Sequence, residues 1–103
     1  MGALSNAIAS SARTAGVEIR TNCHVSHIDI RNSRVEGVVL DNGEEIKGNL
    51  VASNATAYIT FKNLILDDVI KTNEDLNELR KHILNMDYKS GTTKINLALS
   101  GLP

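Results

Sequence analysis

The chain has 103 residues, and its 11 Lys and Arg nearly balance its 12 Asp and Glu. Basic residues are interleaved with acidic ones and aromatic residues are scarce, so we expect no surface for phosphates or stacked bases and no nucleic-acid partner. No apolar run approaches the ~20 residues of a membrane-spanning helix, and the single cysteine, Cys23, cannot form an internal disulfide.

The first predicted element is a helix. Apolar and small residues recur at helical spacing from Leu4 to Ala15, which predicts a helix that packs closely on a sheet. Because the helix begins so early, we expect no targeting peptide within the chain. Gly16 follows as the predicted C-cap, and Val17-Glu18-Ile19 is expected to form a short strand. This order is typical of one half of an α/β unit.

A meander of three strands is predicted next. Residues that favour strands fill Val25–Ile30 and Val35–Leu40, with a polar turn between the two segments. Asp41-Asn42-Gly43-Glu44 is expected to form a two-residue type I′ turn. Glu45–Lys47 then closes this hairpin as the third strand of the meander.

A buried strand is predicted to return the chain to a sheet. Leu50-Val51-Ala52 is short and fully apolar, as in a strand that is buried on both faces. The small polar turn Ser53-Asn54-Ala55-Thr56 follows at its carboxyl end. Open α/β sheets bind ligands at the carboxyl ends of their strands, so this turn is a candidate for ligand contact.

The remaining residues predict two helices and one more strand. Tyr58–Leu66 reads as a short helix, and Lys71–Asp87 as a longer one that begins with a capping box of Thr72 and Asp75. Thr92–Leu99 alternates like a half-buried strand. The predicted strands lack neighbours and would leave sheet edges open. We therefore infer a piece of a larger protein, or a chain whose sheets are completed by a partner.

Reactive side chains are present but form no complete catalytic motif. His24 and His27 beside Cys23 suggest metal ligands, yet these two strand positions point to opposite faces, so surface histidines are expected. Asp67 and Asp68 are adjacent acids, for which we expect exposure to solvent and no catalytic role. Ser53 lacks the Gly-x-Ser-x-Gly motif that presents a serine nucleophile. We predict no catalytic residue and no metal site.

Three segments together resemble a known family. They are MGALSNAIASSARTAGVEIRTNCHVSHI, VEGVVLDNGEEIKGNLVASNATAYITF and YKSGTTKINLALSGLP. Their order and spacing resemble the FAD-dependent oxidoreductases of the phytoene desaturase and amine oxidase type. The resemblance implies an α/β fragment of a two-domain, Rossmann-like FAD/NAD(P)-binding fold. Residues 1–55 would belong to the FAD-binding domain, 56–90 to a helical connection, and 91–103 to the first strand of the substrate domain.

The resemblance also implies a cofactor and its contacts. Val25 would touch the adenine of FAD through its backbone, and Ser53, Asn54 and Ala55 would pass near the cofactor. The intact protein would oxidise C–C or C–N bonds of a small-molecule substrate by hydride transfer to flavin. The family's Gly-x-Gly-x-x-Gly turn, which holds the pyrophosphate, is absent from this chain. We therefore expect the chain alone to be inactive.

A second interpretation treats the chain as a non-catalytic interaction module derived from such a flavoprotein. Its open sheet edges would then pair with a protein partner or with a second copy. An intracellular, mitochondrial location is implied by the resemblance alone.

Overall fold

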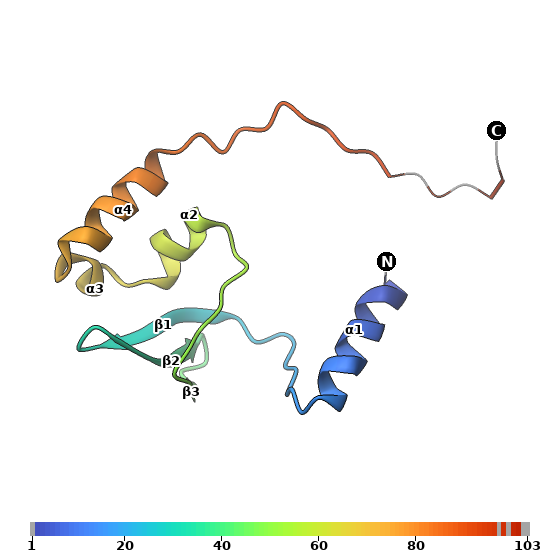
Figure 1. Cartoon of the computed structure of the whole chain (residues 1–103), viewed down its shortest axis with the longest axis horizontal. Coiled ribbons are helices and arrows are strands. Elements are labelled where there is room, and N and C mark those ends of the chain that lie inside the picture. Colours follow the sequence, from blue (N-terminus) through green and yellow to red (C-terminus); the bar gives the residue numbers. More distant parts are fainter. Residues whose placement is uncertain (1, 97, 99, 102–103) are drawn as a thin grey trace.

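The computed structural model describes residues 2–96, 98, 100 and 101. Its centre is an antiparallel sheet of three strands in the order β1-β2-β3 (Figure 1). The strands are β1 (Val25–Arg31), β2 (Arg34–Leu40) and β3 (Glu45–Lys47). The predicted meander is therefore confirmed, because β-branched residues fill its two long strands and turn residues separate all three.

The two-residue turn lies at the first hairpin of the meander and not at the second, where it was predicted. Asn32 and Ser33, alone between β1 and β2, have φ angles of 53° and 60°, as a two-residue type I′ turn requires. After β2, Leu40 N–H donates to the Glu44 carbonyl at 2.9 Å, so the loop has three residues. Within that loop only Gly43 has a positive φ, of 87°. The prediction of a type I′ turn at Asp41–Glu44 is therefore wrong.

Two β-bulges interrupt the pairing of β1 with β2. At the first bulge the register passes from Val25↔Leu40 to His27↔Val39, so Ser26 of β1 has no partner residue in β2. At the second it passes from Asp29↔Gly37 to Ile30↔Val35, so Glu36 of β2 has no partner residue in β1. At the second bulge Gly37 has a φ of 144°. A Cβ at this position would collide with the backbone carbonyl of Ile46 in β3. Only glycine fits there without distortion.

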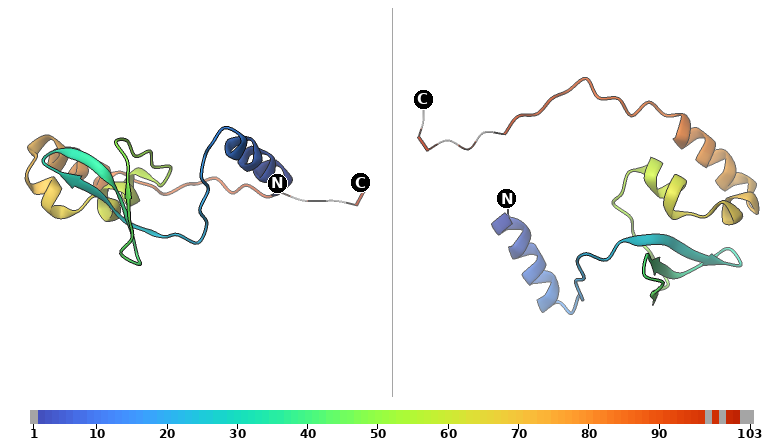
Figure 2. Two further views of the ribbon diagram at one scale, coloured as in Figure 1. Left: turned by 90° about the horizontal axis from the view of Figure 1, so that it is seen from below. Right: turned by 180° about the vertical axis from the view of Figure 1, so that it is seen from behind.

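Short helices form a second layer over the sheet (Figures 1 and 2). The layer consists of α2 (Ala57–Ile59), the π-helix η1 (Thr60–Leu64), α3 (Asp67–Lys71) and α4 (Glu74–Asn85). Asn73 caps α4 by accepting a hydrogen bond of 3.2 Å from Leu76 N–H. The predicted capping box at Thr72 is wrong by one residue, since the Thr72 hydroxyl instead donates to the Val69 carbonyl at 2.8 Å.

The hydrophobic core is thin. Among the described residues, the buried hydrophobic side chains are Ile28 and Leu40 from the sheet and Ile70 and Ile83 from the helices. One ion pair joins the helices, because Arg80 of α4 donates to the Asp67 carboxylate of α3 at 2.5 Å. So small a core can stabilise the sheet and its helices only modestly.

Three predicted strands are not formed. Val17–Ile19 and Leu50–Ala52 have no strand partner, and Leu50 is 87% exposed. The described residues of Thr92–Leu99 also run unpaired, while positions 97 and 99 lie outside the described residues. A strand needs a neighbour for its backbone N–H and C=O groups, and the described residues offer these segments none. The predictions are wrong for this chain on its own.

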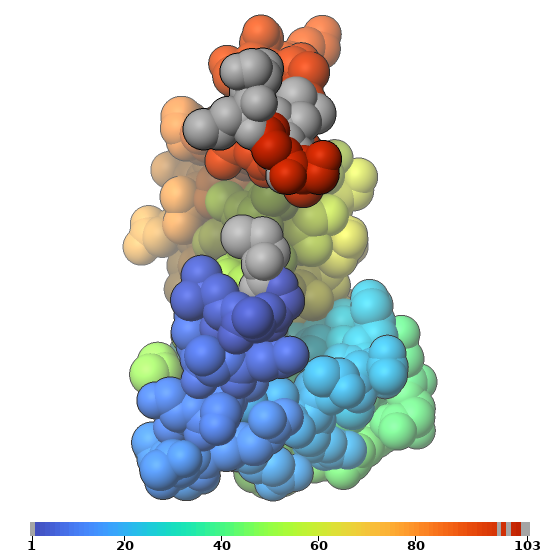
Figure 3. Space-filling model, turned by 90° about the vertical axis from the view of Figure 1, so that its right-hand side faces the viewer, coloured from blue at the N-terminus to red at the C-terminus, as the bar shows by residue number. Residues whose placement is uncertain are grey.

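The N-terminal helix α1 (Gly2–Thr14) forms as predicted but stands apart from the sheet (Figures 1 and 2). In the space-filling view its surface, in blue, faces the viewer uncovered (Figure 3). Leu4 and Ile8 on this helix are 60% and 62% exposed, so the expected packing on a sheet is absent. The radius of gyration is 18.4 Å, against the ~13 Å expected for a domain of this length. None of the described helices is long and apolar enough to cross a lipid bilayer.

Candidate functional site

Val25 begins β1 at a free edge of the sheet. The His24 carbonyl accepts a hydrogen bond of 3.0 Å from Asp41 N–H, so the next pair, Val25↔Leu40, lies between hydrogen bonds and is not joined by them. Residues in such a pair point their N–H and C=O groups away from the partner strand. Among the described residues no strand covers that edge of β1. Val25 therefore offers an unpaired backbone donor and acceptor.

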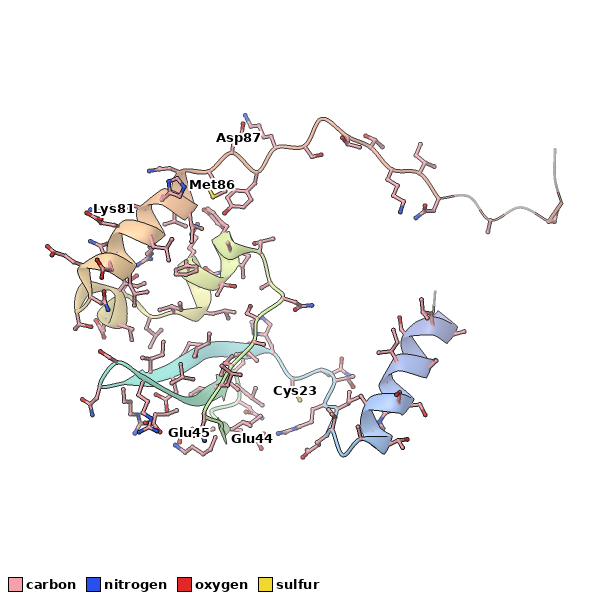
Figure 4. The ribbon with its side chains drawn as sticks, in the orientation of Figure 1. Cys23, Glu44, Glu45, Lys81, Met86 and Asp87 are labelled. Atoms are coloured by element: carbon pink, nitrogen blue, oxygen red, sulfur yellow. The ribbon has the colours of Figure 1, made fainter. Side chains whose placement is uncertain are left out.

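A shallow hollow of about 320 Å³ lies beside Val25. Its lining comes from the segment that enters β1 and from one face of the meander: Glu18, Arg20, Cys23, Val25, Val38, Leu40 and Ile46. Figure 4 shows Cys23 on the entering segment and Glu44 at the second hairpin turn. The hollow thus combines apolar strand side chains with a charged rim.

An ion pair fixes the rim of this hollow. Both terminal guanidinium nitrogens of Arg20, Nη1 and Nη2, donate to the Glu44 carboxylate, with N–O distances of 3.1 and 2.7 Å. The hydrogen bond to Arg20 lowers the pKa of Glu44, and the same bond raises the pKa of Arg20. Both side chains are partly exposed, so the pair holds the geometry of the entering segment and adds little stability.

The turn Ser53-Asn54-Ala55 is exposed and is fastened to the helix that follows it. The Ser53 hydroxyl accepts from Ala55 N–H at 3.3 Å and lies 3.0 Å from the Thr60 hydroxyl. The Thr56 hydroxyl caps α2 by accepting from Ile59 N–H at 3.2 Å. The turn follows an unpaired segment and not the strand end that we predicted. Its conformation is set by these hydroxyl groups.

The structure does not join the predicted site residues in one hollow. Val25 lines the hollow described above, whereas Ser53, Asn54 and Ala55 do not. Val25 and the turn are linked only indirectly. The turn leads into the helix that contains η1, and η1 packs against β1, the strand that Val25 begins. Sequence reasoning missed the Arg20–Glu44 pair, and no local pattern could reveal a contact between residues 24 positions apart.

A larger hollow of about 610 Å³ contains none of the predicted residues. It lies between the first hairpin turn and helices α3 and α4, and its lining comprises Ile30, Asn32, Ser33, Val35, Asp68, Val69, Thr72, Asn73 and Leu76. Its walls come from two stretches more than thirty residues apart in the chain, so no motif could have pointed to it.

The side chains considered as metal ligands are engaged separately. His24 Nδ1 lies 2.7 Å from an Asp41 carboxylate oxygen, and His27 Nδ1 lies 3.1 Å from the Ser26 hydroxyl. The Cys23 thiol donates to the Thr21 carbonyl at 3.3 Å. Across the part of the chain that the structure describes, no three His, Cys, Asp or Glu side chains gather as a metal site would need.

Comparison with known proteins identifies relatives of the chain. The chain is 39% identical over 104 residues to pyridine nucleotide-disulfide oxidoreductase domain-containing protein 2 of Rattus norvegicus. The aligned region covers all of this chain and 17% of that protein. The Mus musculus protein of the same name is 38% identical over the same length. 4,4'-Diaponeurosporene oxygenase of Staphylococcus aureus (strain USA300) is 39% identical over 71 residues, or 69% of this chain. No family model and no solved structure matches.

These similarities confirm the family resemblance found in the sequence: the chain is homologous to one segment of flavoprotein-type oxidoreductases. Within that class, it is similar over its whole length to pyridine nucleotide-disulfide oxidoreductase domain-containing protein 2. The chain spans about one sixth of the length of these two relatives, 17% in each case.

Proposed function

We propose that the chain is one segment of an FAD-dependent oxidoreductase that oxidises C–C or C–N bonds of a small-molecule substrate. The observation that carries this proposal is the 39% identity to a named oxidoreductase-domain protein over the whole chain. In the proposed parent, residues 1–55 form part of the FAD-binding domain, residues 56–90 a helical connection, and residues 91–103 the first strand of a substrate domain.

The geometry at Val25 suits the adenine end of FAD. Adenine presents a hydrogen-bond donor beside an acceptor on one edge, and the outward N–H and C=O of an edge-strand residue can pair with both. The adjoining hollow supplies apolar walls from Val38, Leu40 and Ile46. We therefore assign Val25 to adenine contact in the parent.

The turn Ser53-Asn54-Ala55 suits close approach to a cofactor because its side chains are small and exposed. The chain does not supply every part of an FAD site. A pyrophosphate group is commonly held by a glycine-rich turn that opens a helix, and this sequence contains no such turn. We assign Ser53, Asn54 and Ala55 a share in cofactor contact, and we propose that another part of the parent holds the pyrophosphate.

FAD, when bound, supplies the hydride acceptor of the reaction. The residues of this chain bind and orient it: Val25 pairs with the adenine edge, and the Arg20–Glu44 pair fixes the segment that leads into Val25. We assign no acid or base catalyst to this chain, and we propose that the isolated chain is inactive.

The decisive experiment is to isolate the native polypeptide and measure its mass and its bound flavin. Tryptic peptides of this sequence should come from a band several times heavier than 11.1 kDa, and acid should release fluorescent flavin from the purified protein. A flavin-free native protein would refute the proposal.

We also propose that the native protein is mitochondrial. Recovery of the native protein from the cytosolic fraction alone would contradict this location.

One observation favours the alternative of an interaction module. The free edge of β1 and the exposed Leu4 and Ile8 of α1 are surfaces that a protein partner or a second copy could cover. Peptides found only in an 11.1 kDa band would support this alternative. A sharp monomeric peak in gel filtration, together with a cooperative thermal transition, would count against it.

A further inference from the structure

The helix that follows the turn Ser53-Asn54-Ala55 is unusual. η1 is a π-helix, in which Ile65 N–H donates to the Thr60 carbonyl five residues earlier at 3.1 Å. Such segments are rare and are frequently found at functional sites. Thr60 opens this segment, so its backbone takes part in the widened turn while its side chain faces the residues before α2.

The Thr60 hydroxyl is the link between this helix and the turn. It lies 3.0 Å from the Ser53 hydroxyl, which also accepts from Ala55 N–H at 3.3 Å. The Thr60 N–H donates to the Thr56 carbonyl at 2.9 Å. The two ends of the stretch from Ser53 to Thr56 are thus both bonded to Thr60.

We propose that Thr60 is a positioning residue, which holds the turn Ser53-Asn54-Ala55 in the conformation that contacts the cofactor. The inference rests on the proposed function, because the turn matters here as a cofactor contact. Ser53 is exposed, and a serine on an exposed turn samples several rotamers in water unless a partner restrains it. The half-buried Thr60 provides that restraint.

The test uses the native full-length protein, stripped of flavin and titrated with FAD while the quenching of flavin fluorescence is followed. Thr60→Val keeps the shape of the side chain and removes its hydroxyl. We expect it to weaken FAD binding about 5- to 10-fold, as the loss of one hydrogen bond predicts. Thr60→Ser restores the hydroxyl and should bind within about twofold of wild type by the same reasoning.

Thr72→Val is the matched control, since the Thr72 hydroxyl bonds only to the Val69 carbonyl of its own helix among the contacts described. It should bind FAD like wild type. Equal affinity of Thr60→Val and wild type, or equal weakening by Thr60→Val and Thr60→Ser, would overturn the inference. Equal melting temperatures of the flavin-free Thr60 variants would exclude a general loss of folding.

If Thr60→Val does not fold, Ser53→Ala removes the same bond from its other side. It should weaken FAD binding at least as much, and wild-type affinity would overturn the inference. A wild-type protein that binds no FAD refutes the proposed function and this inference together. A wild type that binds FAD with an unaffected Thr60→Val variant refutes the role of Thr60 alone.

Discussion

Arg20 and Glu44 are joined by two parallel hydrogen bonds of 3.1 and 2.7 Å, which tie the segment entering β1 to the hairpin turn after β2. This geometry fixes both planar groups at once, and it adds to the His24–Asp41 contacts that join the same segment to the loop after β2. Its consequences can be measured because one partner titrates.

The pH dependence of this pair has a definite sign. The Arg20 hydrogen bond lowers the pKa of Glu44 in the folded state below its ordinary value of 4.5. The pair therefore stabilises the folded state fully at pH values above 4.5. This stabilisation is lost as the pH falls through the lowered pKa that Glu44 has in the folded state. Carbon-13 NMR of the Glu44 carboxyl should show a depressed titration midpoint, and Arg20→Gln should return it to the ordinary range. An unchanged midpoint in Arg20→Gln would contradict the prediction.

Gly37→Ala is expected to destabilise the protein by about 2 kcal/mol or more, because it adds steric strain at a positive φ to a collision with the Ile46 carbonyl. Gly43→Ala is the matched control. Gly43 also has a positive φ, of 87°, but a Cβ there meets open space. Urea denaturation should rank Gly37→Ala clearly below Gly43→Ala in stability. Equal losses would show that the bulge can relax.

Ile70→Ala should cost about 2–5 kcal/mol, the usual range for emptying a buried isoleucine site. Ile70 is 1% exposed and belongs to a core of few residues, so its loss should melt the helical layer over the sheet. Ile95→Ala, at a side chain that is 75% exposed, should change the free energy of unfolding by less than about 0.5 kcal/mol. Comparable effects of the two substitutions would contradict the core described here.

Val25→Pro tests the assigned backbone contact with adenine. Proline removes the outward N–H, and proline is tolerated at the first residue of an edge strand when that N–H does not bond the neighbouring strand. We expect FAD affinity of the full-length protein to fall about tenfold, the effect of one lost hydrogen bond. Val25→Ile keeps the backbone donor and should bind normally. A Val25→Pro protein with wild-type FAD affinity would remove Val25 from the site.

The meander could be predicted from sequence because its signals are local. Alternation and β-branching mark β1 and β2, and turn residues separate all three strands. The turn geometries could not be predicted in the same way. Asn32-Ser33 and Asn42-Gly43 offer similar chemistry, and the strand register, which depends on distant residues, decides which loop has two residues and which has three.

The failed strands have one physical cause. Leu50-Val51-Ala52 has the composition of a buried strand, but composition cannot provide the neighbour that such a strand needs. The candidate site shows the same division. Val25 could be chosen from the sequence because of its resemblance to a family. The outward direction of its N–H and C=O depends on the pairing of β1 with β2. The Arg20–Glu44 bond depends on how the folded chain brings distant residues together.

The separation of α1 from the sheet has a consequence for how this polypeptide is made. When this segment is expressed without the rest of a parent protein, Leu4 and Ile8 find no cover within the described residues. Exposed apolar surface on an incompletely covered chain promotes self-association at the concentrations of a recombinant culture. The 103-residue chain produced by itself should accumulate in inclusion bodies or bound to chaperones.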